Sequence, residues 1–91
     1  MPAVQRLDDL NNGGGKLTQT PQAFVTVDSK TVAVVGATGT GHGTGVHAAG
    51  AWQTQGGSST VRINNLRVIR TNDVDSCGHT RVGGSSTTRV G

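Results

Sequence analysis

The sequence predicts a small all-β domain, and three observations lead to this class. Short runs rich in Val, Ile and Thr are separated by turn-forming residues, a pattern typical of short strands. Fifteen of the 91 residues are glycine, and each glycine inside a helix costs about 1 kcal/mol relative to alanine. A strand-forming motif also recurs along the chain. We expect one domain, residues 1–91, at this length.

The recurring motif is the clearest element signal. Residues 56–62, GGSSTVR, return as residues 83–89, GGSSTTR, with one difference. Residues 20–27, TPQAFVTV, form a weaker third copy. Each copy begins with turn-forming residues and continues as a β-type segment. The chain is therefore predicted to contain three related β units.

A second strand follows the first two copies. Residues 25–27 and 31–35 flank Asp28-Ser29, and residues 61–63 and 66–69 flank Asn64-Asn65. Two strands around a two-residue turn of this kind predict a hairpin. The third copy reaches Gly91 after one strand, so we expect it to pair with another molecule or with the N-terminus. Residues 11–20 are interpreted as a glycine-rich polar loop.

All three histidines and the only cysteine form two close pairs, one in each glycine-rich connection between the β units. The pairs are His42 with His47, and Cys77 with His79. Three imidazoles and one thiolate complete a tetrahedral shell for zinc, with no position left for water or substrate. The residues therefore predict a structural metal site, with zinc as the ion and iron as the alternative. The simpler alternative is a set of ordinary loop histidines and a buried free cysteine.

The local sequence agrees with a metal site. Cys77 and His79 are two residues apart, so on an extended segment both side chains point to the same side. Glycines between His42 and His47 allow a tight fold around an ion. With only two aromatic residues and one cysteine, the chain has a thin core and no internal disulfide. Small domains of this kind are usually stabilised by a metal or a partner.

Other function classes fit less well. The segment 32–39 imitates a dinucleotide-binding start, but His42 occupies the third glycine position and the next acidic residue, Asp73, lies far beyond the expected ~20 residues. The net charge is +3 without a basic run, and base-stacking aromatics are scarce, so nucleic-acid binding is not expected. Cys77 with a histidine could form a nucleophilic pair, but no third group stands out to orient it. We expect a protein that is not an enzyme.

The chain contains no apolar run of the ~20 residues that a membrane span needs. Residues 1–9 lack the apolar centre of a signal peptide. We therefore expect the protein to be made in the cytoplasm and to leave it, if at all, by a route that does not read such a signal.

Residues 57–73, GSSTVRINNLRVIRTND, resemble the repeat of the PAAR family, approximately G-S-P-x-V-x-I/V-N-G-x-P-x-A-R-x-G-D. The opening residues 1–9, MPAVQRLDD, resemble the family's M-P-x-A-A-R-x-G-D. The family's Asn-Gly turn is replaced in both hairpins. Val34 stands in place of one arginine of the motif, and the Gly-Asp that follows becomes Gly36-Ala37 and Asn72-Asp73.

The resemblance implies a small conical domain with pseudo-threefold symmetry that caps and sharpens a trimeric β-helical spike. Such caps occur on phage tails and on type VI secretion spikes, where they pierce membranes. The resemblance also implies structural zinc near the apex, held by His42, His47, Cys77 and His79. The alternative is a small zinc-binding β adaptor domain that binds another protein.

The partner implied is the C-terminal end of a trimeric β-helical spike protein, with one tip per trimer. Contact with the target outer membrane would be transient, and neither nucleic acid nor a small-molecule substrate is expected. The location implied is a virion tail tip, or the exterior as part of a bacterial injection machine. Four apolar residues are candidates for the contact with the spike: Val4, Leu7, Leu10 and Phe24.

Overall fold

Three antiparallel strand pairs form the regular structure of the chain, and the computed structural model describes every residue from Met1 to Gly91. The strands are two or three residues long, and the only helical element is a short 3-10 turn, η1. The pairs are β1 (Leu17–Gln19) with β4 (Thr38–Gly39), β2 (Thr26–Val27) with β3 (Lys30–Thr31), and β5 (Arg62–Ile63) with β6 (Leu66–Arg67), and η1 spans Gly45–His47. The predicted all-β class is confirmed.

Both predicted hairpins are present, and their turns explain the sequence. Asp28 and Ser29 have φ values of 56° and 67°, and Asn64 and Asn65 have 51° and 68°. Two successive residues with positive φ make a type I′ turn, whose twist matches that of the flanking strands. Asn and Asp are the non-glycine residues that enter this region most readily. The replacement of the usual Asn-Gly pair therefore leaves the turn type unchanged.

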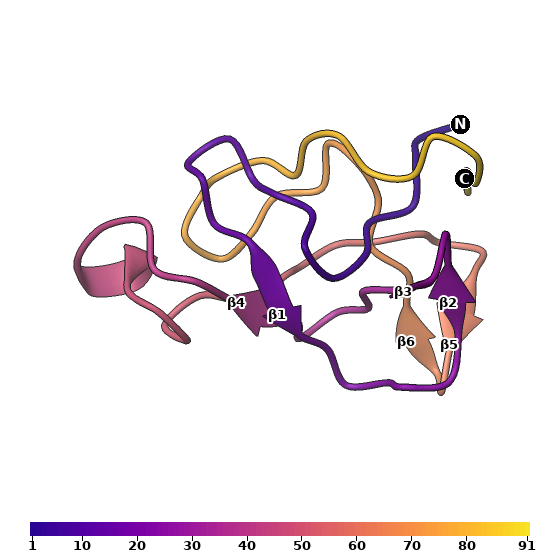
Figure 1. Cartoon of the computed structure of the whole chain (residues 1–91), viewed down its shortest axis with the longest axis horizontal. Coiled ribbons are helices and arrows are strands. Elements are labelled where there is room, and N and C mark those ends of the chain that lie inside the picture. Colours follow the sequence, from indigo (N-terminus) through magenta and orange to yellow (C-terminus); the bar gives the residue numbers. More distant parts are fainter.

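The two ends of the chain pair with each other in antiparallel fashion. We count this pair as a third hairpin, although no turn joins its two strands. Ala3 pairs with Arg89 in an antiparallel bridge, and the Val90 N–H donates to the Pro2 carbonyl oxygen at 2.9 Å. Both termini lie at the same end of the molecule as β2–β3 and β5–β6 (Figure 1). Of the two outcomes predicted for the third copy, closure against the N-terminus is the one observed. We call this end of the molecule the hairpin end.

The three units are joined by a closed ring of backbone hydrogen bonds. The Gln5 N–H donates to Ile69 O at 3.0 Å, Ile69 N–H to Ala33 O at 2.9 Å, and Ala33 N–H to Gln5 O at 2.9 Å. A second ring of three bonds runs in the opposite direction around the same axis, with bonds of 2.9 to 3.0 Å from Leu7 to Thr31, Val35 to Arg67 and Thr71 to Ala3. In each ring every unit donates to one of its two neighbours and accepts from the other. The backbone therefore has pseudo-threefold symmetry.

Each unit also contains the same tight turn, which directly follows its residue in the first hydrogen-bond ring. The third residue of each turn has positive φ, 77° at Asp8, 93° at Gly36 and 80° at Asn72. Two turns are closed by an ion pair between their first and fourth residues, Arg6–Asp9 at 3.0 Å and Arg70–Asp73 at 2.9 Å.

The turn of the second unit has Val34 and Ala37 at the positions of this pair. There the hydroxyl of Thr54 accepts from the Ala37 N–H at 3.0 Å and donates to Val34 O at 2.8 Å. A neutral side chain from a later segment thus replaces the ion pair that the sequence lacks.

The repeat alignment predicted from the sequence is confirmed by side-chain hydrogen bonds. Ser58 Oγ accepts from two backbone N–H groups two and three residues later, at 3.1 and 2.9 Å, and Ser85 Oγ does the same at 3.1 and 3.0 Å. In the weak copy Gln22 Oε1 takes this place, with two bonds of 2.9 Å. The repeated Ser positions therefore hold turns, as local hydrogen bonding predicts.

Two small apolar clusters lie along the molecule. One contains the buried valines Val4, Val32, Val34 and Val68. The other is built on Trp52 with Leu17, Ala33, Ala37 and Ile69. Of the four candidates for partner contact, Val4 is buried in the first cluster and Leu7 packs on the second, whereas Leu10 and Phe24 are exposed, Phe24 by 84%.

Asp28 joins the first hairpin to the third unit. Its carboxylate accepts from Ser85 Oγ at 2.6 Å, Thr87 Oγ1 at 2.7 Å and Arg6 Nη1 at 2.9 Å. These donors, Ser85 first, lower the pKa of Asp28 from its usual value. A carboxylate with a lowered pKa stabilises the fold above its unfolded pKa, and this contribution is lost as pH falls through the folded pKa.

We therefore expect Asp28→Asn to be less stable than the wild-type chain at neutral pH. The difference should shrink as the pH falls below about 4, where the unfolded carboxyl is also protonated. Urea unfolding at several pH values measures the difference between the two chains, so acid effects shared by both cancel. A stability difference that stays constant from pH 7 to pH 3 would contradict the role of this carboxylate.

Candidate metal centre

His42 and His47 are placed by a tight loop around η1. The His47 N–H donates to Thr44 O at 3.1 Å, and the His42 N–H donates to His47 O at 2.9 Å. Gly45, which begins η1, has a φ of 62°, which favours glycine. The loop therefore closes on itself and carries both imidazoles, as the glycine spacing predicts.

Cys77 and His79 lie in a turn and not on an extended segment, so that part of the prediction is wrong. The Gly78 N–H donates to Asp75 O at 2.8 Å, and the Asp75 N–H donates to His79 O at 2.8 Å. Gly78 has a φ of 92°, which lets the chain reverse between the two ligands. The turn still brings the side chains together, with Cys77 Sγ 3.7 Å from His79 Nδ1.

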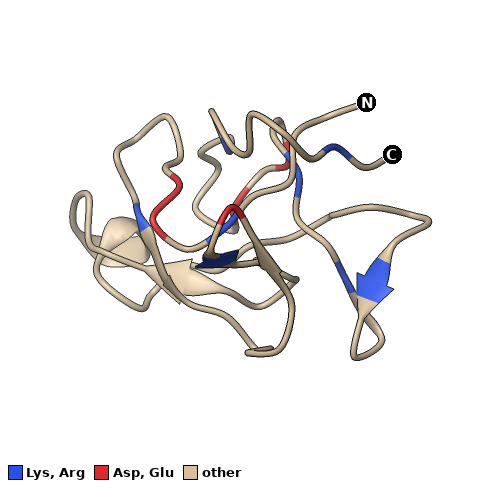
Figure 2. Ribbon diagram, turned by 45° about the vertical axis from the view of Figure 1, so that its right-hand side comes forward, with Lys and Arg blue, Asp and Glu red and all other residues tan.

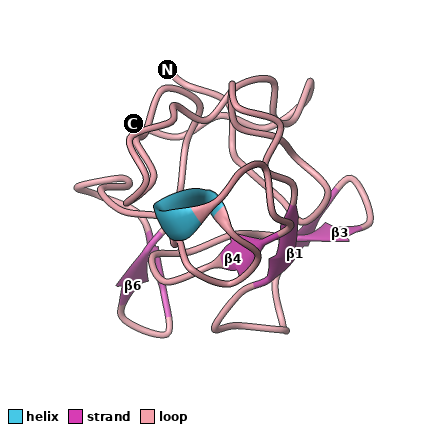
Figure 3. Ribbon diagram, turned by 90° about the vertical axis from the view of Figure 1, so that its left-hand side faces the viewer, coloured by secondary structure: helices cyan, strands magenta, loops and turns pink.

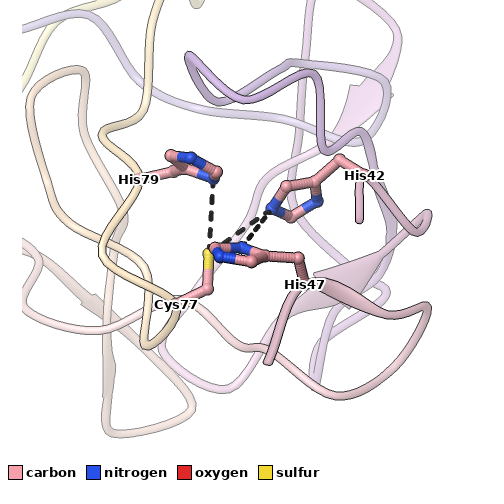
Figure 4. Close-up of side chains that lie close together, drawn as sticks. All are labelled: His42, His47, Cys77 and His79. Carbon is pink, nitrogen blue, oxygen red and sulfur yellow. Dashed lines mark hydrogen bonds between the residues drawn. The ribbon is translucent and has the colours of Figure 1, made fainter. Parts of the chain in front are cut away.

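The four predicted residues converge from these two loops (Figure 4). His42 Nε2 lies 3.2 Å from His47 Nδ1 and 3.6 Å from Cys77 Sγ. One donor atom from each residue lies within 4.8 Å of all the others, and all four side chains are half-buried. The loops that carry them lie away from the hairpin end (Figure 1), and Figure 3 views the molecule from that side, with η1 in front. We call this end the loop end.

Three of the donor-atom separations match those of a tetrahedral ion. Typical bonds of about 2.0–2.1 Å to nitrogen and about 2.3 Å to sulfur place two nitrogens about 3.4 Å apart, and a nitrogen and a sulfur about 3.6 Å apart. Three of the six donor separations, 3.2, 3.6 and 3.7 Å, agree with these values, and none of the six exceeds 4.8 Å. Three imidazole nitrogens and a sulfur directed at one point, as found here, could hold a metal ion.

Trp52 supports the centre from the buried side. Its ring meets the His42 ring edge-on, with centroids 5.5 Å apart, and its Nε1–H donates to Thr40 O at 3.0 Å. The same carbonyl lies 3.5 Å from His42 Nδ1, the nitrogen that faces away from the cluster. A carbonyl in this place orients the ring and leaves Nε2 free to bind a metal.

A buried ion pair joins the second ligand turn to the backbone ring. Arg81 and Asp75 have no exposed side-chain surface, and Arg81 Nη1 lies 3.1 Å from Asp75 Oδ2. Arg81 also donates to Gln5 Oε1 at 3.1 Å and to Asp9 O at 2.8 Å. Burial lowers the pKa of Arg81 and raises the pKa of Asp75, because both charges have left water.

The sequence alone did not predict this pair or the role of the segment beside it. The only indication of the pair in the sequence is its position. Asp75 lies two residues before Cys77, and Arg81 lies two residues after His79. The segment 11–20, interpreted as a polar loop, contains β1 and a stretch fixed to both ligand loops. Asn12 N–H donates to Thr80 O at 2.9 Å, and Lys16 N–H donates to Thr40 Oγ1 at 2.9 Å.

No protein-family model matches this chain, and no curated protein sequence is significantly similar to it. No helix of the structure has the length and apolarity to cross a bilayer. Lysine and arginine are spread over separate segments of the chain (Figure 2).

Proposed function

We propose that the protein is a non-enzymatic spike tip of the PAAR type. It would cap a trimeric β-helical spike of a contractile injection machine, such as a phage tail or a type VI secretion system. The observation that carries the proposal is a pseudo-threefold backbone with one apolar hollow among the three hairpins and a four-ligand cluster toward the other end.

The hollow at the hairpin end follows the pseudo-threefold symmetry. It has a volume of about 190 Å³, and eight of its nine lining residues are hydrophobic. The lining consists of three sets of equivalent positions: Val4, Val32 and Val68; Val27, Ile63 and Val90; Val25, Val61 and Thr88. An apolar hollow on a threefold axis is complementary to the end of a trimer that presents apolar side chains near its own axis.

The other hollows do not favour a small-molecule site. The largest, about 520 Å³, is an open groove lined mainly by Thr, Gln and Gly residues beside β1 and β3. Small-molecule sites are usually lined predominantly by apolar and aromatic side chains. The axial hollow is the apolar one, and its place among the hairpins suits a protein partner.

Zinc is the ion that we propose for the cluster. The four donors leave no position for water or substrate, which is typical of a structural zinc site. Zinc has no redox chemistry and accepts the mixed nitrogen and sulfur set, whereas iron also binds such ligands. Bound zinc would fix the two ligand loops where few apolar residues are available, and so stiffen the part of the molecule that meets a membrane.

The proposed function also implies where the protein would act and what it would contact. The protein would be made in the bacterial cytoplasm and act at a virion tail tip or outside the cell as part of the injection machine. The C-terminal end of the spike trimer would be its partner, and the target outer membrane a transient contact. It would bind neither nucleic acid nor a small-molecule substrate.

Co-expression with the C-terminal β-helix of a trimeric spike protein from the same genome tests the docking. The expected product is a complex of one tip and three spike chains, measured by native mass spectrometry. Val27→Asp places a charge in the hollow and should weaken docking at least tenfold. Thr26→Asp is the matched control, because it adds the same charge at an exposed position on the same strand, outside the hollow lining.

The variants test docking through the hollow, and complex formation by the wild-type protein distinguishes the candidate functions. Equal binding of Val27→Asp and Thr26→Asp would contradict docking through the hollow. A metal-loaded protein that forms no complex with the spike trimer would favour the alternative, a small zinc-binding adaptor for another protein.

A further inference from the structure

Residues 11–16, which we call the strap, lie across the proposed metal centre and are fixed to both ligand loops. Asn12 is hydrogen-bonded to Thr80, the neighbour of His79. Lys16 is hydrogen-bonded to Thr40, two residues before His42. Each connection is reciprocal, because Thr80 N–H donates to Asn12 Oδ1 at 3.1 Å and Thr40 N–H donates to Lys16 O at 2.9 Å. The strap therefore cannot move far without displacing a ligand loop.

Asn11 shapes the interior of the strap. Its Oδ1 accepts from Gly13 N–H at 2.9 Å and Gly15 N–H at 2.8 Å, while its Nδ2 donates to Asp75 Oδ2 at 2.9 Å. Asn11 is 2% exposed, so these bonds are shielded from water. These hydrogen bonds fix the backbone of Gly13 and Gly15 in place beside the imidazole rings.

Gly13 and Gly15 lie close against two imidazoles of the cluster. A Cβ atom on Gly13 would overlap Nδ1 and Cε1 of His79, and one on Gly15 would lie 2.7 Å from Nδ1 of His42 and 2.8 Å from Nδ2 of Asn11. Neither glycine has a positive φ, so the backbone at both positions would accept a side chain. Lack of space is therefore what excludes one.

We propose that Gly13 and Gly15 are positioning residues of the metal centre, an inference that rests on the proposed metal site. Their missing side chains let the strap lie flat against the His79 and His42 rings. The strap holds the rings with their donor atoms toward the cluster and covers them from solvent. Even one methyl group at either position would displace a ring from its ligand orientation.

The matched control lies between them. Gly14 has open space around its Cβ position, but a φ of 91°. Asn72 and Asp8 adopt φ values of 80° and 77° in this same chain, so Gly14→Asn should be accepted by the backbone. The control changes the same strap without adding an atom against a ligand ring.

The test compares Gly13→Ala, Gly15→Ala and Gly14→Asn with the wild-type chain, using Zn²⁺ competition with a chelator and Co²⁺ absorption spectra. Both alanine variants should bind Zn²⁺ about 10 to 100 times more weakly, the usual effect of disturbing groups that orient metal ligands. Their Co²⁺ spectra should also lose intensity from the tetrahedral bands, because a ring has left its position. Gly14→Asn should match the wild-type chain in both measurements.

Two results would overturn the inference. One is wild-type affinity in both alanine variants. The other is weaker binding with an unchanged Co²⁺ spectrum, which would indicate a general loss of folding. Failure of the proposed function is distinguishable, since a wild-type chain that binds no metal would remove the metal centre itself.

Discussion

Cys77→Ser should lose its metal ion and most of its folded structure at room temperature. A serine hydroxyl stays protonated at neutral pH and is a poor substitute for the thiolate that binds zinc. Structural zinc contributes about 10 kcal/mol or more to folding in small domains, comparable with the whole 5–15 kcal/mol stability of a typical domain. Only ten hydrophobic residues are buried in this chain, so little else would compensate.

Circular dichroism and thermal unfolding of the variant measure this effect. The wild-type chain treated with a strong chelator should show the same loss, and the variant should not respond to the chelator. Ser86→Ala, a change at an exposed position, provides the control for substitution itself. A Cys77→Ser protein that unfolds at the wild-type temperature would contradict a structural role for the cluster.

Arg81→Met should produce the next largest effect, a loss of about 3–5 kcal/mol in the free energy of unfolding. The substitution would leave the Asp75 carboxylate buried without its counter-ion, because neither side chain of the pair has exposed surface. It would also remove the donor to Gln5 Oε1. The backbone of Gln5 is part of the first hydrogen-bond ring, where it donates to Ile69 and accepts from Ala33.

Urea unfolding of the metal-loaded protein measures the loss. Adding Asp75→Asn to Arg81→Met should restore part of it, because the buried charge is then gone while the side-chain shape is kept. Arg89→Met, at an exposed arginine, should change stability little. A loss below about 1 kcal/mol in Arg81→Met, the level of an exposed pair, would show that the buried pair does not hold the ligand turn.

Features that depend on local chemistry were predictable from the sequence. The Asp28-Ser29 and Asn64-Asn65 turns identified two hairpins, because few residues accept positive φ at successive positions. The repeated Gly-Gly-Ser motif fixed the alignment of the units, which the Ser58 and Ser85 hydrogen bonds confirm. The residues of the His/Cys cluster were also predictable, since imidazole and thiolate groups are few in this chain.

Features that depend on contacts between distant segments were not predictable. The bond from Asn11 to Asp75 joins residues 64 apart, and nothing in the polar run 11–16 indicates that it covers a ligand cluster. The pairing of β1 with β4 was missed for the same reason, because a three-residue and a two-residue strand carry no periodic signal of their own. The turn at Cys77 was mistaken for an extended segment because a spacing of two suits both conformations.

One metal ion, we propose, joins the two ligand loops of this pseudo-threefold domain. The most direct test is the metal content of the protein purified without added metal or chelator, measured by inductively coupled plasma mass spectrometry and native mass spectrometry. We expect one zinc ion per chain, absent from Cys77→Ser. A folded wild-type protein without bound metal, or metal retained in Cys77→Ser, would contradict the claim.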